Sequence, residues 1–378
     1  MLLHFTDEQE RLRARVRDFA MQEVTKVIPE MEEHDRFPAQ LVREMGSRGL
    51  MGLPVPAEWG GSELELTSYI LTIEEIARVS ATVGVILSVH TSVGTLPILY
   101  HGTTEQKLRC LPKLASGEWL GAFALTEPHA GSDASTIRTA AVRHEDNYVL
   151  NGTKVFITNA GEADQYVLFA SVHNGLNGSV GGITAFLVEK NTPGFRVGKK
   201  EKKMGLHGSN TCELILEDAI VPVGQRLGEE GQGFAIAKSA LNGGRIGIGA
   251  QALGIARAAL ALSEQQLRAL PLRERSRAAA EYRELAAQVE ASALLVYRAA
   301  DMHQRGVRCT KEASMAKMFA SDTAMHATTK TLQWCGGSGL ADELHAERLF
   351  RDAKVTQIYE GTNEIHRLVI SGELLRGS

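Results

Sequence analysis

The segment 148–157 reads Tyr-Val-Leu-Asn-Gly-Thr-Lys-Val-Phe-Ile and decides the fold of the middle of the chain. Its β-branched and aromatic residues flank Asn151-Gly152, and this dipeptide between two such runs is a strong short-range signal of a β-hairpin. Further β-rich runs cover residues 167–172, 183–188 and 214–216, each bounded by glycine or polar residues. We therefore predict an antiparallel β-domain of about six to eight strands, which ends near Gly224.

Both flanks of this β-domain carry helical patterns. On the N-terminal side, Thr6-Asp7-Glu8 can cap a first helix, and apolar residues recur at helical spacing from Thr67 to Val79. On the C-terminal side the chain turns helical after Gly233, and one long amphipathic helix is expected there. Its apolar stripe consists of Tyr282, Leu285, Ala286, Val289, Ala293, Val296, Tyr297 and Ala300. Such a run of helices suggests a bundle.

The predicted fold class is therefore α+β. The expected parts are an N-terminal all-α domain (residues 1–118), a middle β-domain (119–224) and a C-terminal helical bundle domain (225–378). A chain of 378 residues is long enough for two or three domains of ordinary size.

The composition is that of an ordinary globular enzyme, with 44% hydrophobic and 23% charged residues. A net charge of −4 gives no reason to expect nucleic acid or an acidic membrane surface as a partner. No membrane span is expected, and the N-terminus lacks a signal or transit pattern, so we expect a cytoplasmic protein. The scattered cysteines predict neither a disulfide framework nor a metal site. They are Cys110, Cys212, Cys309 and Cys335.

Two glycine-rich segments invite a nucleotide-binding interpretation. Residues 247–252 match G-x-G-x-x-A, but they follow a predicted helix rather than a strand, so close helix packing explains them better than a Rossmann turn. Residues 336–339 (Gly-Gly-Ser-Gly) separate two helical stretches. Glycines there would allow close approach of a ligand or a partner chain, and a plain interhelical loop explains them about as well.

Glu360 is the candidate catalytic base. It lies at a predicted helix–helix junction, with Ile358 and Tyr359 before it and the helix breaker Gly361 after it. A carboxylate among aromatic and apolar neighbours can have a raised pKa and act as a base. Without further context, however, a solvated loop glutamate is by far the commoner explanation of this pattern.

Three motifs together resemble the acyl-CoA dehydrogenase family of the short- or medium-chain type. Residues 124–133 (Ala-Leu-Thr-Glu-Pro-His-Ala-Gly-Ser-Asp) are similar to its flavin-contacting motif, residues 333–340 (Gln-Trp-Cys-Gly-Gly-Ser-Gly-Leu) to its C-terminal signature, and residues 359–362 (Tyr-Glu-Gly-Thr) to its catalytic motif. The resemblance extends from about Phe5 to Leu375, and the helix–strand–helix order expected above is also that family's fold.

The resemblance implies FAD as cofactor. The positions that it assigns to FAD are Phe123, Leu125, Thr126, Phe156, Thr158, Arg268, Gln333, Gly337, Thr362 and Glu364. Thr126 would bind the pyrimidine side of the flavin, Leu125 would supply a backbone contact, and Thr158 would reach flavin N5. Phe156 would lie against the ring, whereas Gln333 and Gly337 would hold the adenylate end from a neighbouring subunit.

The resemblance also implies the reaction. Glu360 would remove the α-proton of an acyl-CoA while the β-hydrogen leaves as hydride to the flavin, giving a trans-2-enoyl-CoA. The thioester oxygen would be held by the backbone N–H of Glu360 and by a ribityl hydroxyl of FAD, a form of oxyanion stabilisation. Electrons would then pass to an electron-transfer flavoprotein, and the enzyme would be a homotetramer. The positions assigned to CoA or to bracing the catalytic loop are Ser132, Asn242, Arg245, Tyr359 and Gly361.

Two departures from the family pattern matter. Some members carry the base on the helix just before Arg245, but those positions are Gly243 and Gly244 here, so Glu360 is the only candidate. The family's Arg-x-x-Phe-Gly loop is replaced by residues 267–272 (Leu-Arg-Ala-Leu-Pro-Leu), which are shorter and lack the Phe-Gly. Arg268 then takes the place of the loop arginine.

Two alternatives to this dehydrogenase remain. A non-catalytic relative that only binds flavin or acyl-CoA is suggested by the shortened loop, although it would have no need of a base. An acyl-CoA oxidase would differ in the access of oxygen to the flavin, which the sequence does not show. Acyl-chain length depends on the depth of the pocket, to which we expect Ile86, Val89, Thr91 and Val93 to contribute.

Overall fold

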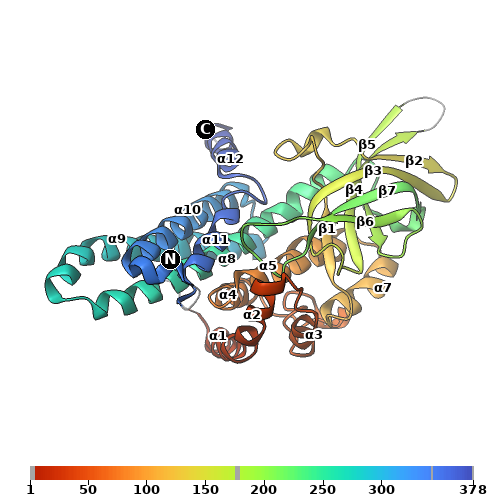
Figure 1. Ribbon diagram of the computed structural model, residues 1–378. Helices are drawn as coiled ribbons and strands as arrows, with labels where there is room; N and C mark the ends of the chain where they lie inside the picture. Colours follow the sequence, from red (N-terminus) through yellow and green to blue (C-terminus); the bar gives the residue numbers. More distant parts are fainter. Residues whose placement is uncertain (1–4, 175–178, 342–343, 377–378) are drawn as a thin grey trace.

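The computed structural model describes residues 5–174, 179–341 and 344–376. It has the expected helix–strand–helix order: a β-domain lies at one end, the long C-terminal helices extend to the other, and the N-terminal helices pack between them (Figure 1). The predicted three-part α+β architecture is thus confirmed.

The N-terminal helices begin at the predicted cap. Thr6 accepts a hydrogen bond from the Gln9 backbone N–H at 3.2 Å, and the Gln9 side chain accepts from the Thr6 N–H at 3.0 Å, which is a capping box. The α-helices are α1 (Asp7–Phe19), α2 (Thr25–His34), α3 (Ala39–Ser47), α4 (Leu66–Ala77), α5 (Ala81–Val89), α6 (Leu96–His101) and α7 (Thr104–Ala115). Short π-helical turns, η1 (Ala20–Val24) and η3 (His90–Thr95), join α1 to α2 and α5 to α6, and the 3₁₀ turn η2 (Ala57–Trp59) precedes α4.

Eight strands form one sheet in the order β6-β7-β3-β2-β4-β5-β8, with β1 paired to β4. The strands are β1 (Gly121–Ala124), β2 (Ala140–His144), β3 (Asn147–Thr158), β4 (Gln165–Asn174), β5 (Ser179–Glu189), β6 (Phe195–Lys200), β7 (Thr211–Pro222) and β8 (Arg226–Leu227). Short 3₁₀ turns, η4 (Ala134–Thr136) and η6 (Val223–Gln225), precede β2 and β8. The sheet is mixed rather than purely antiparallel, because β4 runs parallel to both β1 and β2.

The predicted hairpin at Asn151-Gly152 is wrong, because β3 continues through both residues. The β2–β3 hairpin turns instead at Glu145 and Asp146, which lie between the paired residues His144 and Asn147. Gly152 lies at a register shift against β7, where a β-carbon would come within 2.6 Å of the Thr139 hydroxyl. Asn-Gly here makes a β-bulge, which needs a small residue for the same reason that a tight turn does.

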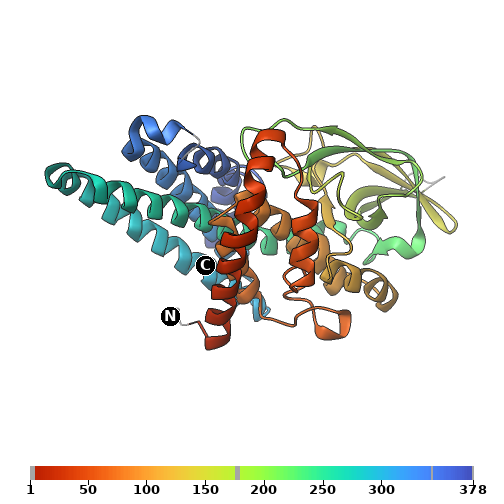
Figure 2. The ribbon, with the colours of Figure 1, turned by 60° about the horizontal axis from the view of Figure 1, so that its bottom comes forward.

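The C-terminal helices form a bundle that extends away from the sheet (Figure 2). They are α8 (Gly233–Ala269), α9 (Leu272–Gln304), α10 (Thr310–Cys335), α11 (Ala346–Thr356) and α12 (Asn363–Arg376), with the 3₁₀ turn η7 (Gly336–Leu340) after α10. The apolar stripe predicted for α9 is largely buried. Residues 247–252 lie inside α8, as expected for glycines that allow close packing, and a β-carbon on Gly247 would come within 2.4 Å of the Ser88 hydroxyl.

Two segments are long and apolar enough to cross a membrane, judged by length and composition alone. They are Ala81–His101 and Gly233–Ala269, and 94% and 72% of their most apolar windows are buried within the protein. That burial is typical of core helices in a globular protein, which pass the same test of length and composition.

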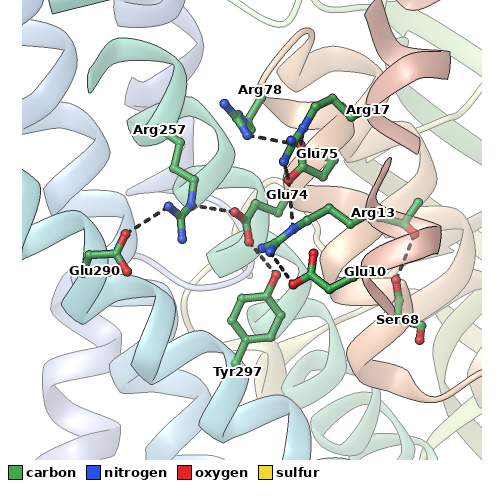
Figure 3. A network of polar contacts seen from close by, with 11 residues as sticks. Glu10, Arg13, Arg17, Ser68, Glu74, Glu75, Arg78, Arg257, Glu290 and Tyr297 are labelled. Atoms are coloured by element: carbon green, nitrogen blue, oxygen red, sulfur yellow. Dashed lines mark hydrogen bonds and ion pairs between the residues drawn. The ribbon is translucent and has the colours of Figure 1, made fainter. Parts of the chain in front are cut away.

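A buried network of charges joins the N-terminal helices to the bundle (Figure 3). The Glu74 carboxylate on α4 binds Arg257 of α8 at 2.6 Å and accepts a hydrogen bond from the Tyr297 hydroxyl of α9 at 2.5 Å. The carboxylate of the neighbouring Glu75 forms an ion pair with the Arg17 guanidinium of α1 at 2.9 Å. Because buried charges are costly without partners, this network fixes α4 against α8, the helix that carries one wall of the candidate active site.

Candidate active site

Glu360 lies in the short connection between α11 and α12. Its φ is +53° and that of Gly361 is +98°, so the chain makes a left-handed turn that glycine tolerates and most residues do not. The Tyr359 hydroxyl donates a hydrogen bond to Gln251 on α8, which ties the turn to the bundle. Glu360 is only partly exposed, and its Oε2 is buried with no hydrogen-bond partner among the residues that the structure describes.

The Glu360 carboxylate lies directly against Gly244 of α8. A β-carbon at that position would come within 1.9 Å of Glu360 Oε2 and 2.6 Å of its carboxyl carbon. Contacts of this length do not occur between non-bonded atoms, so only glycine fits. Position 244 therefore cannot carry a side chain while the Glu360 carboxylate lies against it.

The surroundings suit a base that works near neutral pH. Burial raises the pKa of Glu360 to about 7, against the opposing effect of the positive charges of Arg245 and Lys317. Burial also lowers the pKa of Lys317 to about 7. A carboxylate with a pKa near the working pH combines a useful ionised fraction with enough basicity to accept a proton.

Arg245 and Asn242 line a cavity beside the Glu360 turn. Asn242 donates to the Thr310 hydroxyl at 3.2 Å and accepts from Arg245 at 3.4 Å, whereas Arg245 Nε is buried with no partner among the described residues. The cavity has a volume of about 460 Å³ and is lined by Lys238, Asn242, Arg245, Arg308, Thr310, Ile365, Leu368, Val369, Gly372 and Glu373. Of its three cations, Arg308 is paired with Glu373 at 2.8 Å, which leaves Lys238 and Arg245 for a phosphate-bearing ligand.

A second group of predicted residues gathers at the end of β1 and in β3. The Val155 N–H donates to the Thr126 carbonyl at 2.9 Å, which places Thr126 beside the Phe156 segment. Thr126 and Thr158 are partly exposed, and their hydroxyls make no hydrogen bond to any other described residue. Phe156 is 64% exposed with a φ of +57°, so its ring is presented to solvent rather than to the core. An exposed ring and two threonine hydroxyls without a partner among the described residues fit a flat heteroaromatic ligand such as a flavin.

The backbone of this group rests on a buried ion pair. Lys154 is fully buried, and its Nζ donates to the Leu125 carbonyl at 3.0 Å and to Glu127 at 2.8 Å. The Lys154 ammonium thus holds the main chain at Leu125 in place. Phe123 is half-buried, with its ring centroid 5.0 Å from that of Phe169.

The remaining predicted residues are not all in one place. Thr362 and Glu364 adjoin the Glu360 turn, and Ser132 is exposed in the loop between β1 and β2. Gln333 and Gly337 are exposed at the end of α10. Arg268 lies in the last turn of α8, and the connection from α8 to α9 forms the tip of the bundle farthest from the sheet (Figure 1).

Arg268 and Gly337 both lie at open positions of the chain. Arg268 is 76% exposed and pairs with Glu264, one turn earlier on α8. A β-carbon on Gly337 would meet no atom within 4 Å, so packing within the chain does not require glycine there. The connection between α8 and α9 and the β-domain that carries Thr126 lie at opposite ends of the molecule (Figure 1).

Three supporting residues were missed from the sequence. They are Gly244, Lys154 and Lys317, to which the motifs assign no role in supporting the base or the cofactor. Lys317 did carry a signal, because it lies at helical spacing among the small residues Ala313, Ala316 and Ala320, all of which are buried. A lysine on an otherwise small apolar face predicts a buried cation with specific partners.

Comparison with known proteins gives the same architecture. Models of the N-terminal, middle and C-terminal domains of acyl-CoA dehydrogenases match residues 6–118, 122–219 and 231–375. An acyl-CoA dehydrogenase of Bacillus subtilis (strain 168) is 55% identical, with 100% of each chain covered.

Two solved structures agree over the whole length. Butyryl-CoA dehydrogenase from Megasphaera elsdenii is 43% identical with a TM-score of 0.94, and 100% of each chain is covered. A chain from work on the electron transferring flavoprotein of Acidaminococcus fermentans and flavin-based electron bifurcation is 44% identical, with a TM-score of 0.95 and the same coverage. With all three domain models matched in order, the chain belongs to the acyl-CoA dehydrogenase family.

Proposed function

We propose that the protein catalyses FAD-dependent α,β-dehydrogenation of a short- or medium-chain acyl-CoA to a trans-2-enoyl-CoA, with Glu360 as the base. The observation that carries this proposal is the Glu360 carboxylate, which lies against Gly244 with a pKa of about 7 and an unpartnered oxygen. A proton acceptor that is half-ionised near neutral pH suits the removal of a weakly acidic α-proton.

FAD fits the residues of the β-domain group. Thr126 and Thr158 offer free hydroxyls, Phe156 offers an exposed ring, and the buried Lys154 fixes the Leu125 segment beneath them. When bound, FAD accepts the hydride from the β-carbon of the substrate. Gln333, Gly337 and Arg268 would hold the far end of a cofactor bound mainly by another subunit, which is the reason we propose a homotetramer.

The acyl-CoA would enter beside α8. Asn242 and Arg245 would brace the catalytic turn and contact CoA, and the cations around the 460 Å³ cavity would attract its phosphates. Tyr359 and Gly361 flank Glu360 and set its direction, whereas Ser132 would contact CoA from the β1–β2 loop. The Glu360 N–H would donate to the thioester oxygen, where negative charge develops as the α-proton leaves.

An electron-transfer flavoprotein is the proposed acceptor, and the cytoplasm the proposed location. The first follows from the similarity to a chain solved in work on such a flavoprotein. A direct test is a visible spectrum of the purified protein, followed by anaerobic addition of butyryl-CoA. We expect a flavin spectrum that bleaches within seconds and whose reoxidation is fast with electron-transfer flavoprotein and slow with oxygen. Fast reoxidation by oxygen would indicate an oxidase, and a stable, unbleached flavin would indicate a binding protein.

Saturated straight-chain CoA esters of short to medium length are expected to be the best substrates. The expectation rests on similarity to butyryl-CoA dehydrogenase and on the small Gly243-Gly244 pair beside Glu360. A competition assay with esters of increasing chain length, together with branched esters, measures the ratio of kcat/KM values. A preference for long or branched esters would contradict this assignment.

FAD is expected to bind less tightly than is usual in this family, because the turn between α8 and α9 is short and lacks the Phe-Gly. If Arg268 contacts a cofactor phosphate, Arg268→Ala removes a charge-assisted hydrogen bond of about 1.5–3 kcal/mol. The FAD dissociation constant, measured by fluorescence titration of the apoprotein, should then rise at least tenfold while the tetramer remains. Added FAD should raise the melting temperature by mass action. Flavin that survives long dialysis in both wild type and Arg268→Ala would contradict both expectations.

A further inference from the structure

The loop that carries Glu360 is held from one side by α10. Lys317 on that helix is fully buried, and its Nζ donates to the Gly361 carbonyl at 2.8 Å and to Asn363 Oδ1 at 3.0 Å. Both acceptors lie within three residues of Glu360, and one belongs to the left-handed turn itself. An ammonium at this place therefore fixes the turn by its main chain and by the first residue of α12.

The second anchor also comes from α10. Asp322 accepts hydrogen bonds from the Gln357 side chain at 2.6 Å and from Asn363 Nδ2 at 2.7 Å, so it bridges the two ends of the loop. Ser321 donates to Asn363 Oδ1 at 3.2 Å. These bonds hold the ends, and Lys317 is the group that reaches the middle of the turn, at Gly361. Connected buried polar networks of this kind specify one geometry.

The charge of Lys317 acts on the carboxylate as well. The groups that face Glu360 are Arg245 from α8, Lys317 from α10, Tyr69 from α4 and Tyr359 from the loop itself. The groups around Lys317 are Glu360, Asp322, Arg245 and Glu364, and the buried His366 of α12 lies near it. Burial raises the pKa of Glu360, and the two cations Arg245 and Lys317 oppose that rise.

We propose that Lys317 is a positioning residue for the base: its ammonium holds the Glu360-Gly361 turn against Gly244 and keeps the carboxylate ionised. This proposal rests on the proposed function of Glu360. Lys317 does not itself touch the reacting atoms, so its effect must appear through the behaviour of Glu360.

Three substitutions of Lys317 separate its hydrogen bonds to the loop from its charge. Lys317→Gln retains an N–H donor for the loop and removes the charge, whereas Lys317→Met removes both. Lys317→Arg retains a charge that does not titrate. Lys26→Met is the control, because Lys26 on α2 is 66% exposed and pairs with Glu23 at 2.7 Å, away from the site.

The measurement is the rate of flavin bleaching by butyryl-CoA in the holoenzyme, followed from about pH 5.5 to 9.5. The ionised carboxylate is the active form, so the rate falls below the pKa of Glu360. Removing a nearby cation raises that pKa by about one unit. We therefore expect the acid limb of Lys317→Gln and Lys317→Met to move to higher pH, with rates about tenfold lower at pH 6.5 and largely recovered at pH 9. Lys317→Met should also lower the rate at its own optimum.

The position of the acid limb distinguishes a positioning lysine that acts through its charge from a purely structural one. Lys26→Met should retain the wild-type acid limb. Lys317→Arg should retain it or move it to lower pH, because the pKa of Lys317 is about 7 and an arginine stays charged above that pH. A rate that falls in Lys317→Gln and Lys317→Met without any movement of the limb would mean a purely structural lysine and would overturn the proposal. If Lys317→Met fails to fold, the acid limbs of Lys317→Gln and Lys317→Arg are compared instead, because these two variants also differ in the charge at position 317. If butyryl-CoA does not bleach the wild-type flavin at any pH, the proposed function of Glu360 is wrong and this proposal falls with it. If the wild type is bleached but the acid limb of the Lys317 variants does not move, this proposal alone is wrong.

Discussion

Glu360→Gln is expected to slow flavin reduction by acyl-CoA at least about a thousandfold, because an amide cannot accept the α-proton and a positioned base contributes up to about 10⁴-fold. Glutamine has nearly the same shape, so FAD should remain bound and the fold intact. No second carboxylate is available on α8 beside Glu360, because the positions there are Gly243 and Gly244. Stopped-flow bleaching under anaerobic conditions measures the rate, and the visible spectrum measures flavin content.

A matched control is Glu217→Gln on β7, whose carboxylate is 70% exposed and pairs with Arg196 at 3.2 Å. Its rate should equal that of the wild type. If Glu360→Gln turns over within tenfold of the wild type, Glu360 is not the base.

Gly244→Ala is the second substitution with a large expected effect. The added methyl group would come within 1.9 Å of Glu360 Oε2, so the carboxylate must move out of its place. A displacement of about 1 Å at a reacting group can cost on the order of 10²-fold in rate. We therefore expect kcat to fall by about that factor, with flavin content unchanged, because Gly244 lies away from the β-domain group.

Gly243→Ala tests whether the effect is specific. It adds the same methyl group to the preceding residue of the same helix, where the nearest atom, His303 Nε2, is 3.6 Å away. We expect less than a tenfold change with butyryl-CoA. Equal losses in the two variants would indicate a general disturbance of α8 rather than displacement of Glu360.

The Glu360 assignment shows how far residues alone could be interpreted. A carboxylate beside Tyr359 and Gly361 has many solvated equivalents in other proteins, and only the matching motifs singled it out. The contact with Gly244 joins positions 116 apart in the chain (360 − 244). No local pattern encodes such a contact, because it depends on how α8 and the α11–α12 turn pack.

The Asn151-Gly152 error has the same origin. Asparagine followed by glycine fits a tight turn and a β-bulge equally well, since both need a residue without a bulky side chain. Two tertiary contacts favour the β-bulge over the turn. Thr139 lies against Gly152, and Asp218 accepts a hydrogen bond from the Asn151 side chain at 3.0 Å. Both partners lie on other parts of the sheet or its loops, outside the window in which a turn signal is judged.

By itself, the sequence determined the succession of helix, strand and helix, the capped start of α1 at Thr6 and the long buried stripe of α9. These features repeat over short distances, so local periodicity and capping chemistry are enough to encode them. Tertiary structure alone decided that β4 pairs in parallel with β1 and β2, that Gly244 accommodates Glu360, and that Lys317 reaches Gly361. Each of these depends on packing between segments far apart in the chain, where burial gives a carboxylate and an ammonium their altered pKa values.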